Sequence, residues 1–261
     1  MKHTILLAVA SQENLIPFME ASDGLLSKSI QKRFKVVFLD EVLQKQTVTV
    51  QASEQGRIDR LVSRVENDLL VEKYARERGY AVELLHEVED ELTLQSQCSV
   101  ADLIIIDFDF PDKLTSYNLI KEAFSQADCP KLLLFPNGMS FNCLVAVHYA
   151  SKASVRVLKD FLKLFDESFT KLPFSLLMDE PRGELEMKRE RVFINYLKLF
   201  FEDMGAQHIY DEPLDSLLNF IRNECENPLL MVNSELGQEI MESDEFLNSP
   251  MPNHPIFISK D

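Results

Sequence analysis

The chain repeats its own pattern, and this repeat limits the folds that it can adopt. Thr4–Ala10 is matched by Asn142–His148, 138 positions later, and Lys35–Glu41 is matched at the same offset by Pro173–Asp179. Further along, the offset becomes 126 and stays there, which aligns Gly79–Glu83 with Gly205–Ile209 and Ala101–Ile106 with Asn227–Val232. Two constant offsets in sequence indicate an internal duplication with one deletion in the second copy.

The deletion removes 12 residues and maps near residues 43–55 of the first copy. A repeat of this length predicts two folded domains, because the units of solenoid proteins are far shorter. The chain of 261 residues is long enough for two domains of ordinary size. Pro136–Gly138 is the turn-rich break between the copies, so we place the domains at residues 1–138 and 139–261.

Short apolar runs rich in Ile, Leu and Val recur in both halves. They are nearly continuous and do not alternate with polar residues, a pattern typical of strands that are covered on both faces. This predicts an α/β fold with a mostly parallel sheet and helices on each side. The expected strands are Ile5–Val9, Lys35–Leu39, Ala81–Leu85, Leu103–Ile106 and Lys131–Phe135, then Cys143–Val147, Phe174–Met178, His208–Tyr210, Leu229–Val232 and Ile256–Ser259.

Helical periodicity lies between these runs. A first helix is expected from Ser11 to about Arg33, and its counterpart from about Ser151 to Phe165. Gly79 and Gly205 follow the next pair of helices at matching places, as C-terminal caps would. The apolar stripes of that pair are Ile58, Leu61, Val62, Val65, Leu69 and Tyr74, and Phe193, Tyr196, Leu197, Phe200, Phe201 and Met204. The last helices are expected at residues 114–127 and 236–246, and the polar segment 44–53 is either an extra edge ribbon or a mobile loop.

Composition excludes several partners. With 43 acidic and 27 basic residues the net charge is −16, which argues against nucleic acids and anionic lipids, because binding to either requires clustered Lys and Arg. No segment approaches the roughly 18 apolar residues of a membrane helix, and the apolar run after Lys2 is too short for a signal peptide. The four cysteines show no metal-type spacing, so we interpret them as reduced, which suits an acidic protein of the cytoplasm.

The strand sequences resemble those of the universal stress protein family. The matching segments are Ile5–Val9, Ala101–Ile106 and Cys129–Pro136 in the first half, and Leu144–Val147 and, more weakly, His254–Ile258 in the second. The resemblance implies two Rossmann-like open parallel sheets of five strands, in the order 3-2-1-4-5, arranged as a pseudo-two-fold tandem. It also implies that the fifth strands pair, which would place Lys131–Phe135 near Ile256–Ser259 and protect two exposed sheet edges.

In an open parallel sheet, ligands bind outside the carboxyl ends of the strands where the strand order reverses. The order implied by the resemblance puts that point between the first and fourth strands of each half. The candidate cleft residues follow those strands: Ser11, Asp107 and Asp109, with Ala10 and Phe108, in the first half, and His148, Tyr149, Asn233, Ser234 and Gly237 in the second.

The nucleotide motif of the family is degraded here. Members that bind ATP carry an Asp directly after the first strand and a loop of the form G-x2-G-x9-G-(S/T) after the fourth, because glycines let backbone N–H groups approach phosphate oxygens. In this chain Ala10 and His148 take the two Asp positions, and no glycine occurs between Ile106 and Gly138. We therefore expect that ATP binding is lost and that there is no cofactor. The alternative is an ATP or AMP site retained in the second half, which keeps Gly237.

Other arrangements point only weakly to chemistry. Asp107, Asp109 and Asp112 could hold a cation, but they lack a glycine-turned calcium loop, so solvated carboxylates are the preferred interpretation. His148 beside Tyr149 could act as a general base or ligand anchor, and a structural histidine is preferred. The basic residues Arg182, Lys188, Arg189 and Arg191 alternate with Glu184, Glu186 and Glu190, which predicts a solvated, self-compensating face.

The expected function is therefore a non-enzymatic, cytoplasmic, stress-response or regulatory role exerted through protein or small-ligand contacts. We expect no catalytic residues, no metal, no nucleic acid or membrane partner, an internal pseudo-dimer and a possible homodimer. The alternatives are an adenine-nucleotide-binding module that uses the second half and, as a third class, a hydrolase or transferase that uses His148.

Overall fold

The structure is a computed structural model. It describes residues 2–39, 54–86, 91–108, 121, 124, 127–135, 141–148, 152–210, 212–243 and 254–259. The expected ribbon or loop at residues 44–53, most of the expected helix at residues 114–127, and the break at Pro136–Gly138 lie outside the described residues. Within the part of the chain that is described, no helix is both long and apolar enough to cross a membrane.

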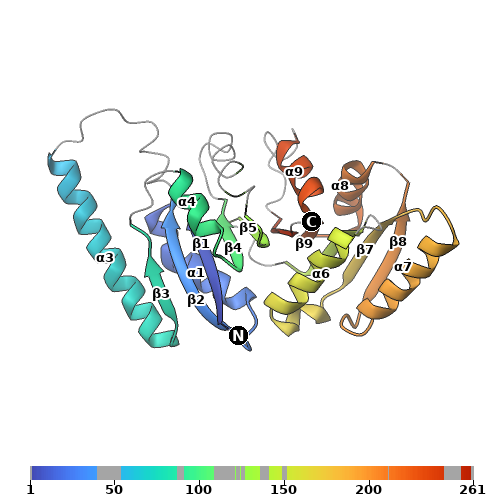
Figure 1. The fold of residues 1–261 in the computed structure, drawn as a ribbon, viewed down its shortest axis with the longest axis horizontal. Coiled ribbons are helices and arrows are strands. Elements are labelled where there is room, and N and C mark those ends of the chain that lie inside the picture. The colour runs from blue at the N-terminus through green and yellow to red at the C-terminus, as the bar shows by residue number, and fades with distance from the viewer. Residues whose placement is uncertain are drawn as a thin grey trace. The chain divides into compact units, whose positions relative to one another are not determined.

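The strands form one mostly parallel sheet flanked by helices (Figure 1). The strand order is β3-β2-β1-β4-β5-β10-β9-β6-β7-β8, so the ten strands belong to a single sheet and not to the two five-stranded sheets expected from the sequence. The expected pairing of the two fifth strands is confirmed, because β5 (Lys131–Leu134) pairs antiparallel with β10 (Ile256–Ser259), with Leu132 opposite Phe257. Main-chain pairing of these two strands removes the sheet edges that would otherwise separate two sheets.

The chain divides into two compact units. The first comprises Met1–Gly24 and Lys28–Cys129, and the second comprises Leu25–Ser27 and Pro130–Asp261. Leu25–Ser27 belongs to the second unit because its backbone is bonded there: Ser27 N donates to Leu164 O at 2.9 Å, and Leu25 O accepts from Asp166 N at 3.0 Å.

The first unit contains the strand order β3-β2-β1-β4. The neighbouring strands in this order pair parallel to each other. Its strands are β1 (Lys2–Val9), β2 (Gln31–Phe38), β3 (Ala81–Leu84) and β4 (Leu103–Asp107), and its helices are η1 (Gln12–Asn14), α1 (Leu15–Leu25), α3 (Glu54–Arg78) and α4 (Glu91–Cys98). Every residue of β4 is buried, as its continuous apolar sequence predicts. Gly79 ends α3 with a φ of 71°, and this confirms it as the C-terminal cap.

The second unit holds the remaining strands in the order β5-β10-β9-β6-β7-β8. Its further elements are β6 (Cys143–His148), α6 (Lys152–Leu164), η2 (Glu167–Lys171), β7 (Phe174–Asp179), α7 (Glu184–Leu197), β8 (Met204–Ile209), α8 (Pro213–Glu224), β9 (Pro228–Asn233) and α9 (Ser234–Glu242). Helix α6 buries Val157, Leu158 and Phe161 against β6, β9 and β10, so the expected helix from about Ser151 to Phe165 is confirmed.

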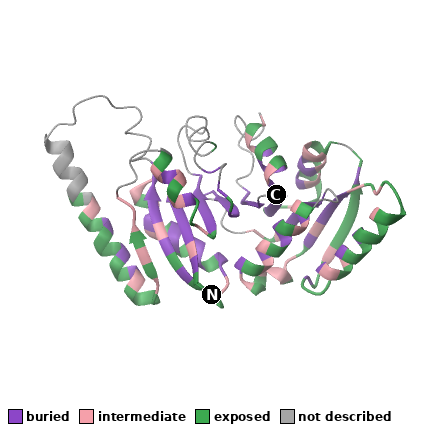
Figure 2. Cartoon of the chain, viewed as in Figure 1, coloured by how far each residue is buried: buried purple, intermediate pink, exposed green. Residues whose placement is uncertain are grey.

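Three boundaries differ from the sequence-based prediction. Helix α1 ends at Leu25, and the residues expected to continue it to Arg33 start β2, where buried and exposed side chains alternate. Helix α7 ends at Leu197, so Phe200 and Met204 do not extend it. Gly205 lies inside β8 and is not a helix cap. Figure 2 shows the reason at β8: its residues are mostly exposed, and an edge strand of this kind carries no apolar run.

The cysteines also differ from expectation. Cys143 and Cys225 form a disulfide across 82 positions of sequence, while Cys98 and Cys129 are buried and not disulfide-bonded. Cys143 is the first residue of β6, and Cys225 follows α8. The two residues meet because β9 starts beside β6, with Cys143 opposite Pro228 and Asn142 N donating to Asn227 O at 3.1 Å. Spacing in sequence could not show this neighbourhood, and the interpretation that all four cysteines are reduced is wrong.

A buried ion pair joins α1 and β2 of the first unit, and Tyr80, in the turn before β3, bonds to it. Lys32 Nζ lies 2.7 Å from Asp23 Oδ1, and both side chains are at most 9% exposed. Tyr80 donates to the other carboxylate oxygen at 2.9 Å. Both oxygens of this carboxylate therefore have donors, which is the condition for tolerating a buried charge.

Candidate functional site

The carboxyl ends of the first and fourth strands are adjacent in both units. In the first unit β1 lies between β2 and β4, with Ala8 opposite Ile106, so Ala10 and Ser11 follow one strand while Asp107 ends the other. In the second unit β6 lies between β7 and β9, with Ala146 opposite Met231. These are the positions at which the sequence placed a ligand cleft.

Asp107 bonds to the loop after β1. Its side chain is only 2% exposed, and Oδ2 accepts hydrogen bonds from the backbone N of Ala10 at 3.2 Å and from Asn14 Nδ2 at 3.3 Å. Ser11 contributes backbone geometry, because its carbonyl accepts from Asn14 N at 3.2 Å in the first turn of η1. The carboxylate of Asp107 therefore already accepts the backbone N–H that follows β1, at Ala10.

This arrangement is unfavourable for a bound polyphosphate. Two unit negative charges about 4 Å apart repel by about 4 kcal/mol at the effective dielectric constant typical of sites near a protein surface. The hydrogen bonds between Asp107 and its donors at Ala10 and Asn14 would also have to be replaced by equally good ones. At the carboxyl end of β4 an anion would need hydrogen-bond donors, but the donors there are already bonded to the carboxylate of Asp107.

His148 ends β6 in the second unit and is buried. Its ring is 5% exposed and lies 4.5 Å, centroid to centroid, from the ring of Phe193 on α7. Burial lowers the pKa of His148 to about 4, so the imidazole is neutral at pH 7. Its Nδ1 has no hydrogen-bond partner among the described residues. A neutral ring packed on an aromatic side chain fits the preferred interpretation of a structural histidine, while its role in binding stays a prediction.

The residues after β9 build the start of α9. Asn233 is 5% exposed, and its Oδ1 accepts from Leu236 N at 3.1 Å as the N-cap, with Ser234 as the first helical residue. Gly237 is buried, and a Cβ there would lie 2.9 Å from Ile258 Cδ1 of β10. The missing side chain of Gly237 therefore allows α9 to pack closely on β10, which is a structural reason for a glycine independent of phosphate binding.

Two of the candidate cleft residues, Asp109 and Tyr149, lie outside the described residues. Ser11, Asp107, His148, Asn233, Ser234 and Gly237 lie at the strand ends where they were expected, each within its own unit. Among the described residues, no group of three or more His, Cys, Asp or Glu side chains could hold a metal ion.

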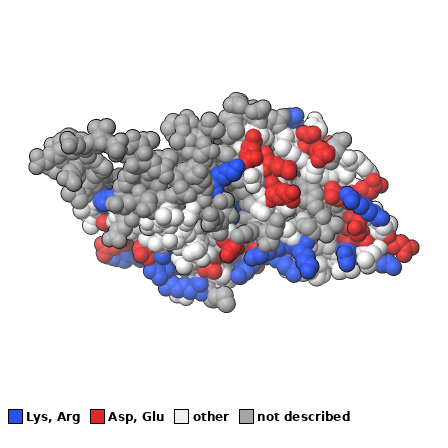
Figure 3. All heavy atoms as spheres, turned by 45° about the horizontal axis from the view of Figure 1, so that its top comes forward, with Lys and Arg blue, Asp and Glu red and all other residues white. Residues whose placement is uncertain are grey.

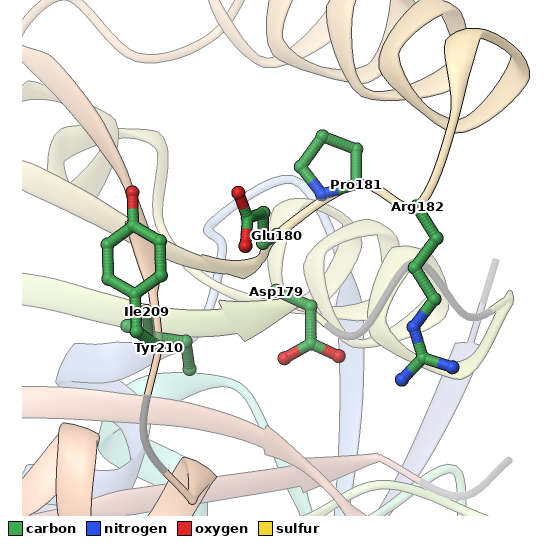
Figure 4. A pocket seen from close by; sticks show the side chains of 6 residues that line it. All are labelled: Asp179, Glu180, Pro181, Arg182, Ile209 and Tyr210. Atoms are coloured by element: carbon green, nitrogen blue, oxygen red, sulfur yellow. The ribbon is translucent and has the colours of Figure 1, made fainter.

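A cavity in the second unit lies at different strand ends. It has a volume of about 370 Å³ and is lined by Asp179, Glu180, Pro181, Arg182, Ile209 and Tyr210, which follow or end β7 and β8 (Figure 4). Sequence reasoning missed this cavity because it assigned Arg182 to a self-compensating charged face. Of the basic side chains in that group, Lys188 is the one with an ion pair, to Glu184 at 3.8 Å, while the guanidinium of Arg182 has none among the described residues.

The surface carries both signs of charge. On the face drawn in Figure 3, acidic and basic side chains both occur over the second unit, and acidic side chains gather in several places. This fits the excess of 43 acidic over 27 basic residues. The net charge predicts that neither nucleic acids nor anionic membranes are partners of this chain, and this stays a prediction.

Comparisons with known proteins show the fold. A universal stress protein from Archaeoglobus fulgidus DSM 4304 has a similar structure, with a TM-score of 0.59 and 12% sequence identity over 99% of this chain and 96% of that one. No family model matches the sequence. A search of curated proteins finds no significant match either. At this identity the similarity shows that the chain has a fold like that of universal stress proteins.

Proposed function

We propose that this chain is a non-enzymatic protein of the universal stress protein type, with a stress-linked or regulatory role exerted through protein or small-ligand contacts. The similar structure supports the family assignment through its fold, and nearly the whole of both chains takes part in that similarity. The low sequence identity of 12% to that structure agrees with a fold that is kept while the sequence diverges.

Loss of nucleotide binding in the first unit is the central part of this proposal. The observation that carries it is the buried carboxylate of Asp107, which accepts from Ala10 N and Asn14 Nδ2 at the carboxyl ends of β1 and β4. A nucleotide phosphate at these donors would have to displace a like charge. The second unit gives weaker support for the loss of nucleotide binding. There the N–H of Leu236 donates to Asn233, and the absence of a side chain at Gly237 allows α9 to pack on β10.

Calorimetric titration with Mg²⁺-ATP and with AMP tests the proposal. We expect no binding heat for the full chain with either ligand, and no appearance of binding in Asp107→Asn, which removes the charge but keeps an acceptor at Ala10. Saturable heat for the unaltered chain would contradict the proposal. If that heat disappeared in His148→Ala, the retained adenine-nucleotide site would be the one in the second unit.

The location of the protein is a separate question. Disulfides are rare in the reducing cytoplasm, and the pairing of Cys143 with Cys225 removes the cysteine-based support for a cytoplasmic location. We keep the cytoplasm as a proposal that rests on the family-like fold. Labelling of thiols in rapidly acidified cells tests it: trapping of both cysteines as a disulfide in the native host would count against this location.

A further inference from the structure

The cavity at the ends of β7 and β8 is lined by polar side chains that form no hydrogen bond or ion pair with one another. The carboxylates of Asp179 and Glu180, the guanidinium of Arg182 and the phenol of Tyr210 have no hydrogen bond or ion pair to any described residue. Asp179 is half-buried, whereas Glu180, Arg182 and Tyr210 are exposed, so water satisfies these groups when no ligand is bound. The cavity is therefore a local concentration of unused donors and acceptors.

Asp179 and Arg182 carry opposite charges on the same short segment without forming an ion pair. Asp179 and Arg182 flank Glu180 and Pro181, and in Figure 4 their side chains extend in the same direction from this segment. Proline fixes φ near −65° and restricts the residue before it, so the backbone of this segment has little conformational freedom. Glu186 on α7 accepts from the backbone N of Arg182 at 2.6 Å, which anchors the loop to the first turn of the helix.

We propose that this cavity binds a small α-amino acid with a basic side chain, an assignment that rests on the ligand-binding role proposed above. The carboxylate of such a ligand matches the forked guanidinium of Arg182. Its two cationic groups match the carboxylates of Asp179 and Glu180. Ile209, which is 8% exposed, offers an apolar surface for the aliphatic stem, and the exposed ring of Tyr210 can lie against a cation.

Charge and size select this ligand class over nucleotides. The lining carries two carboxylates and one guanidinium, so a ligand with a net positive charge and one carboxylate completes every pair, whereas a phosphate would face two like charges. The volume of about 370 Å³ lies at the small end of the range of ligand pockets, which begins at about 300 Å³. The cavity also lies beside β8, whereas the strand-order reversal of this unit lies between β6 and β9.

The test uses the full chain and L-arginine as the probe, with binding followed by ligand-observed NMR at low ionic strength. We expect saturable binding with a dissociation constant on the order of 1 mM or tighter. Agmatine, which lacks the carboxylate, should bind about 5- to 10-fold more weakly, and Arg182→Gln should reduce the affinity for L-arginine by a similar factor. Arg189→Gln is the matched control, because it removes the same charge from the exposed face of α7, and it should leave affinity unchanged.

Three results would overturn the assignment: no saturable signal up to about 10 mM L-arginine, equal affinity for agmatine and L-arginine, or equal effects of Arg182→Gln and Arg189→Gln. Circular dichroism of each variant shows whether it is folded. ATP titrated against the same preparations separates this assignment from the broader proposal, because ATP binding would contradict the loss of nucleotide sites without affecting the response to L-arginine.

Discussion

Reduction of the disulfide between Cys143 and Cys225 is expected to destabilise the second unit strongly. The bond closes a loop of 82 positions that includes β6, α6, β7, α7, β8 and α8. A cross-link of this kind acts mainly by lowering the entropy of the unfolded chain. The expected effect can therefore be worked out from the length of the loop alone.

With 82 positions in the loop, the chain-entropy relation gives a loss of about 15 cal/mol/K, which is about 4.5 kcal/mol at 25 °C. This is a large part of the roughly 5–15 kcal/mol that stabilises a typical domain. The local contact at the loop ends also depends on the bond, because the turn before β9, with Asn227 at a φ of 51°, is held beside the first residue of β6.

Hydrogen exchange of peptides from β6 and β9, measured in urea with and without reductant, gives the free energy of opening for this unit by itself. The double variant Cys143→Ser/Cys225→Ser should match the reduced protein and should not respond to reductant. Cys98→Ser is the control, because Cys98 is buried but not bonded to another cysteine. The reasoning fails if reduction changes the opening free energy by less than about 1 kcal/mol, or if the oxidised, denatured chain shows four reactive thiols and not two.

Three further predictions concern single side chains. Gly237→Ala should cost about 1–3 kcal/mol by overpacking against Ile258, and Ile258→Val should restore part of it; urea unfolding measures both. Because burial lowers the folded pKa of His148 to about 4, the unfolded chain binds more protons at this residue between about pH 4 and 6.5, so its contribution to stability should fall by about 3 kcal/mol as pH drops through that window; His148→Gln should lack this part of the fall and keep the part that His254, with a pKa also lowered to about 4, contributes. Lys32→Met should cost about 3 kcal/mol by removing the donor to Oδ1 of the buried Asp23, whose Oδ2 keeps Tyr80 and Arg78, and adding Asp23→Leu should recover part of the loss; full additivity of the two changes would contradict this.

The sequence was informative wherever burial was two-sided. Strands such as Leu103–Asp107 and Pro228–Asn233 are buried at every position, and their apolar runs located them to within a residue or two. Strand β8 was misplaced because its positions are mostly exposed, so no apolar run marks it and Gly205 looked like a cap. Helix α1 was extended too far because β2 alternates in burial but not in residue type: the strand carries three charged residues, and one of them, Lys32, takes a buried position through its pair with Asp23.

The sequence predicted where the candidate site lies, but not the hydrogen bonds that its residues form. Strand order fixes where the ends of β1 and β4 meet, and Asp107 was expected there. Its hydrogen bonds to Ala10 and Asn14 could not be foreseen, because they depend on the turn that η1 makes after β1. The unpaired state of Arg182 was missed for a similar reason: charge alternation in sequence does not show which side chains approach within bonding distance.

Hydrogen-bond satisfaction gives a reason for ligand binding at one place in the second unit over another. At the end of β9 the N–H of Leu236 is already bonded to Asn233, so a ligand there must displace an internal acceptor, at a cost of about 1–3 kcal/mol for each buried group left unmatched. At the ends of β7 and β8 the charged groups of Asp179 and Arg182 have no internal partner among the described residues, so a ligand displaces only water. We therefore expect a ligand with modest intrinsic contacts to bind at the cavity before it binds at the strand-order reversal. Substituting Asn233 by Ala, which frees the N–H of Leu236, should not weaken L-arginine binding, and a loss of that binding would place the ligand at the end of β9.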